Sequence, residues 1–146
     1  SSGLEDLAIF RLKCAIFMQM TYVGVPSIYY GDEIGMEGGR DPYNRAPFDW
    51  RHIDIDILGT VKELGELRNK EEVLKRGFYK TLYAKDGVLV YARYFKDGCD
   101  AFGEKAKDSY VICGVNRDFR EHTVDLSEFT DKTLTIPPIG YKFIKG

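Results

Sequence analysis

The sequence has little of what disulfide and metal chemistry requires. Its three cysteines, Cys14, Cys99 and Cys113, are odd in number and form no C-x-x-C pair, so we expect neither a disulfide framework nor a metal–thiolate site. The two histidines, His52 and His122, have no partners at metal-ligand spacing, so no metal or cofactor is predicted. Free thiols are typical of a reducing compartment, which favours a cytoplasmic location.

Long apolar runs and an excess of one charge are also missing. No run reaches the ~20 residues that cross a bilayer, so no membrane partner is expected. The 21 basic residues nearly balance 23 acidic ones, which leaves no basic field for nucleic acid. Hydrophobic residues make up 44% of the chain, the usual share for a globular protein, and 146 residues suffice for one core.

Two kinds of apolar periodicity divide the chain near Gly77. Residues 4–20 and 57–74 carry apolar side chains at helical spacing, and Gly77 is a stop signal. From Phe78 onward the period changes to two, and Lys85-Asp86-Gly87 is a hairpin turn signal. Helices followed by strands favour two units, 1–76 and 77–146. The predicted strands are 78–83, 87–95, 109–116, 122–126, 134–136 and 140–144.

Between the two predicted helices lies the most informative stretch, residues 24–50. It begins with a short apolar run, 25–30, which Gly31 ends, as in a buried strand. Acids, a Gly-Gly pair and the charged segment 40–45 follow. Charged side chains on a glycine-hinged loop after a rigid strand are typical of binding groups. Helix, strand, loop and helix together make one unit of an α/β barrel.

This stretch resembles the last barrel strand of the α-amylase family of glycoside hydrolases. The matching residues read G-V-P-S-I-Y-Y-G-D-E-I-G-M and then G-G-R-D-P-Y-N-R-x-P-F-x-W. Residues 12–22 resemble the preceding barrel helix, and residues 63–70 resemble the final one. The resemblance implies α/β followed by all-β: the last strand and flanking helices of a (β/α) barrel at 1–76, and a C-terminal antiparallel β-sandwich domain at 77–146.

The same resemblance implies an enzyme of which this chain is only a part. A single strand with two helices cannot close a barrel of eight units, so we expect the remainder of the catalytic barrel as a partner. The implied substrate is an α-glucan such as starch, maltodextrin or pullulan. The D-P-Y-N-R segment points to the branch of neopullulanase, cyclomaltodextrinase and amylopullulanase.

No catalytic residue is predicted within this chain. Retaining glycosidases need two carboxyl groups about 5–5.5 Å apart, and the family takes its catalytic carboxylates from earlier strands, whose motifs have no match here. Asp32 and Glu33 are neighbours that would point to opposite faces of a strand, so we expect them to anchor the loop. The chain alone is therefore expected to be inactive.

Asp41 and Arg45 are the predicted substrate-binding residues. The resemblance implies that they bind the sugar on the non-reducing side of the cleaved bond. A carboxylate accepts hydrogen bonds from vicinal hydroxyls, and a guanidinium donates to sugar oxygens. The alternative is an ion pair that merely stabilises the loop.

Two non-catalytic functions stay open for the β-rich half. It could bind glycan by itself, or it could serve as a structural domain that shields the apolar surface of the barrel. Glycan binding would call for exposed aromatic side chains, but the sequence after Phe78 does not separate exposed rings from core rings. Trp50 is likewise open to two interpretations: it is either a platform on which a sugar stacks or a core residue.

Overall fold

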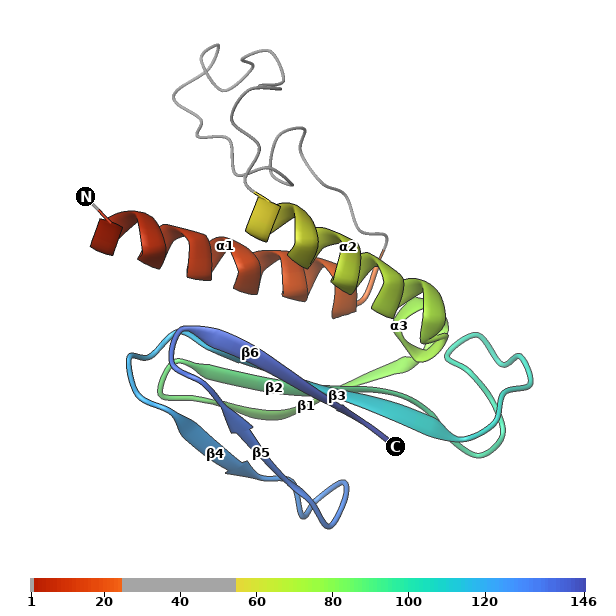
Figure 1. Ribbon diagram of the computed structural model, residues 1–146. Coiled ribbons are helices and arrows are strands. Elements are labelled where there is room, and N and C mark those ends of the chain that lie inside the picture. Colours follow the sequence, from red (N-terminus) through yellow and green to blue (C-terminus); the bar gives the residue numbers. More distant parts are fainter. Residues whose placement is uncertain (1, 25–54) are drawn as a thin grey trace.

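The computed structural model describes residues 2–24 and 55–146 (Figure 1). Helices come first along the chain and strands afterwards, so the α/β-then-all-β order is confirmed. The helices are α1 (Ser2–Thr21), α2 (Ile55–Lys70) and α3 (Val73–Arg76); the strands are β1 (Phe78–Lys85), β2 (Val88–Phe95), β3 (Ser109–Asn116), β4 (His122–Asp125), β5 (Thr133–Ile136) and β6 (Gly140–Lys145).

The strands form two antiparallel sheets. The large sheet has the order β1-β2-β3-β6, and β4 pairs with β5 in a separate hairpin. At the β1–β2 turn, Asp86 and Gly87 have φ of 56° and 80°, and Lys85 pairs with Val88. Two left-handed residues between paired strands make the turn that matches strand twist, so the predicted hairpin signal is confirmed.

The large sheet is the middle of three layers (Figure 1). Alternate residues of β2 and β3 face α1 and α2 on one side and the β4–β5 hairpin on the other. This explains why the two strands are buried almost continuously rather than at every second residue. The helix-facing core includes Phe17, Leu64, Leu74, Tyr91, Val111 and Cys113; the hairpin-facing core includes Val90, Ala92, Ile112, Val124, Leu134 and Ile136.

The helices α1 and α2 run parallel and lie side by side. Lys13 of α1 meets Asp56 at the start of α2, and Arg68 near the end of α2 meets the last turn of α1. Successive helices of an α/β unit are parallel because the strand between them runs the opposite way. Phe17 fastens α1 to the sheet by stacking on Tyr141, with ring centroids 4.4 Å apart.

The second predicted helix is interrupted, which the periodicity of 57–74 did not reveal. After α2 ends at Lys70, the amides of Leu74 and Lys75 donate to the carbonyls three residues earlier. These two amides lie within the short α3, whose first turn is therefore tightened. The change from helix to strand falls at Gly77, but the division into two domains at this point stays a prediction. Helix and strand residues share one of the two cores.

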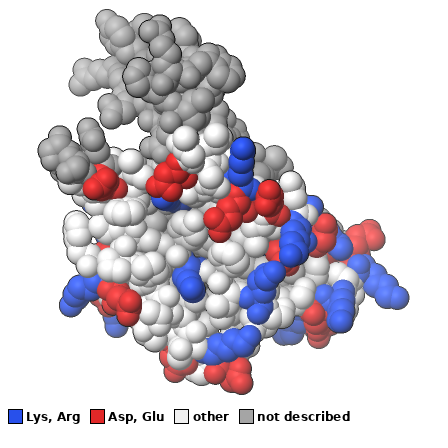
Figure 2. Space-filling view, in the orientation of Figure 1, with Lys and Arg blue, Asp and Glu red and all other residues white. Residues whose placement is uncertain are grey.

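The described surface carries both charges. Figure 2 shows acidic and basic side chains interspersed on the visible face, with no field of one sign. Within the described residues, no helix is long and apolar enough to cross a membrane. Phe10 of α1 has 48% of its surface exposed, so α1 presents apolar surface away from the sheet as well as toward it.

Gly114 of β3 is required by the approach of the β4–β5 hairpin. A Cβ atom there would lie 2.6 Å from Ile136 Cδ1 and 2.8 Å from Leu134 Cδ2. We expect Gly114→Ala to lower the free energy of unfolding by about 1–3 kcal/mol through overpacking. Urea unfolding of the 146-residue chain measures this change.

Gly65 provides the matched control. It lies within α2, where an added Cβ meets nothing within 4 Å. Gly65→Ala is expected to raise stability by about 0.5–1 kcal/mol, because alanine loses less backbone entropy in a helix. Equal stability of the two alanine variants would contradict the close packing of the sheets.

Candidate functional site

The predicted sugar-binding residues Asp41 and Arg45 lie outside the described residues, as do Asp32, Glu33 and Trp50. The structure describes the two chain positions that flank them, Gly24 and Ile55, and the side chains that hold those positions. The described part of the candidate site therefore consists of these supporting contacts.

At the Ile55 end, the support is an ion pair between the two helices. The Asp56 carboxylate in the first turn of α2 accepts from Lys13 Nζ at 2.5 Å. An acid in the first turn also complements the positive end of the helix dipole. Because the Asp56 side chain is largely exposed, the pair contributes at most about 1 kcal/mol. Its effect is to fix where α2 starts relative to α1.

At the Gly24 end, Arg68 of α2 binds the carbonyls that end α1. Its Nη1 donates to Met20 O at 3.0 Å and to Tyr22 O at 3.4 Å, and its Nη2 donates to Gly24 O. The last carbonyls of a helix have no partner within the helix, and α1 has no basic residue in its last turn. Arg68 supplies from a neighbouring helix the cation that this helix end lacks.

Arg93 of β2 joins the same helix end to α3 and to the start of β1. Its side chain is almost fully buried, with 1% exposed. Nη1 donates to Thr21 O and to Leu74 O, both at 3.0 Å, and Nη2 donates to Gly77 O at 3.1 Å. One guanidinium therefore ties together three segments that are far apart in sequence.

No carboxylate of the described residues pairs with Arg93. Burial, and then the neighbouring Arg68, lower the pKa of Arg93 from its ordinary value. The carbonyl dipoles at the ends of α1 and α3 face its charge instead. Removal of Arg93 would leave those carbonyls buried without a donor, which is costly.

Thr21, Tyr91 and Cys113 lie close to this cluster but are suited to packing rather than to reaction. Thr21 Oγ1 donates to Phe17 O at 2.7 Å and shares a hydrogen bond with the Tyr91 hydroxyl. Burial raises the pKa of Tyr91 and raises that of Cys113 to about 12. Both groups therefore stay neutral near pH 7, and a neutral buried thiol is inert.

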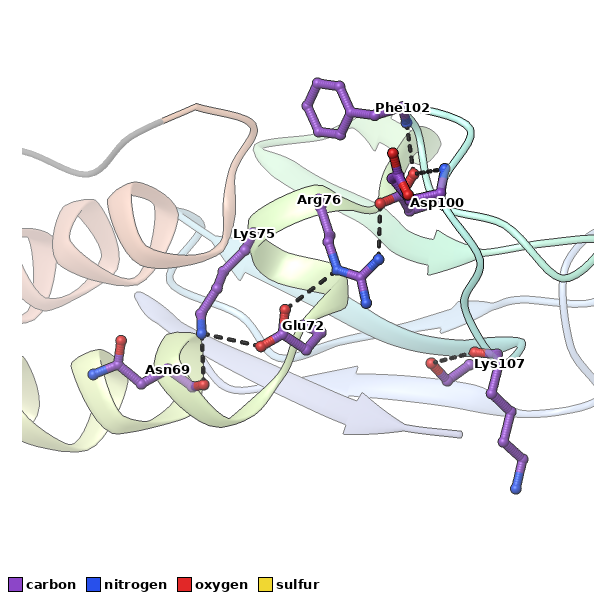
Figure 3. A network of polar contacts seen from close by, with 9 residues as sticks. Asn69, Glu72, Lys75, Arg76, Asp100, Phe102 and Lys107 are labelled. Carbon is purple, nitrogen blue, oxygen red and sulfur yellow. Dashed lines mark hydrogen bonds and ion pairs between the residues drawn. The ribbon is translucent and has the colours of Figure 1, made fainter.

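A second polar network fixes α3 to the loop 96–108 (Figure 3). Arg76 Nη1 lies 2.8 Å from Asp100 Oδ2, and Asp100 Oδ1 accepts from the amides of Phe102 and Glu104. Burial opposes ionisation of Asp100, but Arg76 and the two amides outweigh it and hold its pKa below the ordinary value. Glu72 accepts from Arg76 on the same side of α3.

This network holds Phe102 at the protein surface. The ring is 77% exposed and borders a pocket of about 710 Å³, which Val23, Gly24 and Arg68 also line. The loop thus extends to the point where the chain leaves α1.

Three carboxyl groups of the described residues have a shifted pKa, and none is shifted in the direction that a glycosidase acid requires. A general acid of a glycosidase needs a raised carboxyl pKa, whereas Glu72, Asp100 and Asp118 all have lowered ones. The hydrogen bond from Lys75 lowers the pKa of Glu72, and the hydrogen bond from His122 lowers that of Asp118. For Asp100, burial acts to raise the pKa, but the hydrogen bonds from Arg76 and from the two amides together outweigh it. Within the same residues, no three metal-binding side chains gather.

Sequence reasoning missed Arg68 and Arg93, although two signals were present. Arg93 interrupts the apolar strand V-L-V-Y-A-R-Y-F, and a charged residue in such a strand is rarely buried without partners. The last turn of α1 contains no basic residue, so its carbonyls need donors from elsewhere. Neither signal identifies the partner, because the contacts of these two arginines with the end of α1 span 44 to 72 positions of sequence.

The chain is similar in sequence to curated α-glucan enzymes. It is 42% identical over 130 residues to an amylopullulanase of Thermoanaerobacter thermohydrosulfuricus, a match that covers 88% of this chain and 9% of that protein. It is 40% identical over 131 residues to a cyclomaltodextrinase of Thermoanaerobacter pseudethanolicus, covering 88% and 21%. The chain thus spans about a tenth to a fifth of the length of these relatives. No protein-family model matches it.

Solved structures show the same fold. An α-amylase from Geobacillus thermoleovorans, complexed with acarbose, superposes with a TM-score of 0.76 at 28% identity. The match covers 94% of this chain and 33% of that one. The arrangement of helices and sheets described above is therefore shared with a known glycosidase.

Arg93→Met should destabilise the chain by about 3–5 kcal/mol, because it leaves several buried carbonyls without a donor while keeping the apolar stem. Arg93→Lys should restore only part of the loss, since the three donors of an ammonium share one nitrogen and cannot reach the carbonyls that the guanidinium reaches from separate nitrogens. Urea unfolding measures both.

Arg120→Met is the control for Arg93→Met. The Arg120 side chain is 81% exposed, so a change within about 0.5 kcal/mol is expected. A loss for Arg93→Met no larger than that of the control would show that the buried contacts do not hold the helix ends.

Proposed function

The chain belongs to the α-amylase family of glycoside hydrolases, and on that premise we propose that it is the C-terminal part of an enzyme that hydrolyses α-glucosidic bonds with retention of configuration. The substrate class is an α-glucan such as starch, maltodextrin or pullulan. The similarity to an amylopullulanase and a cyclomaltodextrinase supports this choice.

The observation that carries the proposal is the parallel pair α1 and α2 with both flanking positions held. Lys13 and Asp56 fix one end, and Arg68 fixes the other at Gly24. This is the framework that a barrel unit needs to present a loop at a defined place. A purely structural β-domain would not need the helix pair.

Asp41 and Arg45 bind the substrate in this proposal. The Asp41 carboxylate accepts hydrogen bonds from vicinal hydroxyls, and the Arg45 guanidinium donates to sugar oxygens. The catalytic carboxylates come from the remainder of the barrel, which the parent enzyme contributes. The isolated chain therefore lacks the pair of catalytic carboxylates and has no hydrolytic activity.

We also place the parent enzyme in the cytoplasm. Cys14, Cys99 and Cys113 are all unpaired in the structure, and free thiols persist in a reducing compartment.

In the parent enzyme, Asp41→Ala and Arg45→Ala should each lower kcat/KM on a short maltooligosaccharide about ten- to a hundredfold. A charge-assisted hydrogen bond contributes about 1.5–3 kcal/mol, and contacts to the distorting sugar tighten in the transition state, so kcat should fall too. A reducing-sugar assay measures the rates, with the isolated 146-residue chain expected to release nothing.

Asp131→Ala is the matched control, since Asp131 is an exposed acid of the β-rich half. It should keep wild-type kinetics. Wild-type kcat/KM in either Asp41→Ala or Arg45→Ala would contradict the sugar-binding role. A fall in melting temperature together with the activity would support the loop-stabilising ion pair instead.

A further inference from the structure

A hollow of about 490 Å³ lies on the side of the large sheet that faces the β4–β5 hairpin. Three aromatic rings line it, those of Tyr94, Tyr110 and Phe129, each partly exposed. The Phe129 ring centroid is 5.3 Å from that of Tyr94 and 5.4 Å from that of Tyr110, with steeply inclined planes. The volume falls within the range of about 300–1,000 Å³ that is usual for small-molecule sites.

The rings are held in place by the turn that follows β4. The amides of Phe129 and Thr130 donate to Leu126 O at 2.8 and 2.9 Å, and Leu126 is itself buried in the core. The Tyr110 hydroxyl shares a hydrogen bond of 3.3 Å with Thr130 Oγ1. The aromatic surface is therefore preformed, which lowers the entropy cost of binding a ligand.

Charged side chains with unused hydrogen-bonding groups stand around the rings. Lys80, Lys96 and Glu128 line the hollow and are exposed. Among the described residues, no hydrogen bond or ion pair engages their charged ends. Asp108 also lines the hollow, but its carboxylate accepts from the amides of Asp97 and Gly98. The hollow thus offers free donors and a free acceptor beside an apolar surface.

This chemistry suits a neutral, polyhydroxylated ring. Aromatic rings present an apolar face, against which the C–H face of a sugar can pack. The ammonium groups donate to hydroxyl oxygens, and the carboxylate accepts from hydroxyl protons. An ion of either sign would meet at least one like charge, whereas a sugar can use both.

We propose that this hollow binds a short stretch of α-linked glucan chain and is a second glycan site, separate from Asp41 and Arg45. The choice of α-linked glucose rests on the proposed function, whereas the inference that the hollow binds a sugar rests on its aromatic and charged lining. The hollow lies on the hairpin side of the large sheet. The helices α1 and α2, whose ends flank residues 25–54, cover the opposite side of that sheet (Figure 1). Holding one glucan chain at two places raises the effective substrate concentration.

The direct test is a titration of the 146-residue chain with maltoheptaose, followed by amide NMR shifts. Saturable shifts are expected at residues 94–96, 108–110 and 128–129. The double variant Lys96→Ala/Glu128→Ala should weaken binding about tenfold, because it removes two hydrogen-bonding groups without opening the core. Lys62→Ala/Glu66→Ala, an exposed pair on α2, should bind as the wild type does.

Three outcomes would overturn this site: no saturable shift, shifts confined to other residues, or equal affinity in Lys96→Ala/Glu128→Ala. Equal binding of cellohexaose would overturn the choice of the α linkage. In the parent enzyme, the same variant should raise KM for amylose severalfold and leave kcat/KM for maltotriose unchanged. Because maltotriose hydrolysis reports the proposed activity without this site, failure of one proposal is distinguishable from failure of the other.

Discussion

The arrangement of helices and sheets depends on how the C-terminal end of α1 is satisfied. Helix ends leave carbonyls without intrahelical donors, and this end is buried against the large sheet. Arg68 approaches it from α2 and binds the carbonyls of residues 20, 22 and 24. Arg93 approaches it from β2 and binds the carbonyls of residues 21, 74, 77 and 78. Because each guanidinium is planar and donates in several directions, two side chains can fix three segments at once.

This constraint connects the stability of the chain with its proposed role. The carbonyl of Gly24, the last described residue before the predicted sugar-binding segment, is one of the acceptors. The same sheet that carries Arg93 on its helix-facing side carries Tyr94 and Tyr110 on the other side. Because its residues alternate between two faces, the large sheet anchors α1 and α2 with one face and lines the aromatic hollow with the other.

Much of the fold followed from the sequence because local signals were strong. The strand alternation after Phe78, the Asp86-Gly87 turn and the helical spacing of residues 4–20 each depend on residues close in sequence. The break between α2 and α3 and the Arg93 contacts could not be predicted in the same way, since they follow from packing between distant segments. The hollow could not be predicted from the sequence either. Its three rings come from β2, β3 and the turn after β4, and only the fold shows which rings stay exposed. Asp41 and Arg45 stay predictions of the sequence.

The central claim is that the buried arginines make α1 and the large sheet one cooperative unit. Native-state hydrogen exchange tests it most directly, on the amides of residues 17–21 in α1 and 90–93 in β2. The claim predicts that both groups exchange with the same free energy of opening, to within about 1 kcal/mol, because α1 cannot leave without exposing the guanidinium groups and carbonyls. The claim would be contradicted if the free energy of opening of the α1 amides were more than roughly 2 kcal/mol below that of the β2 amides.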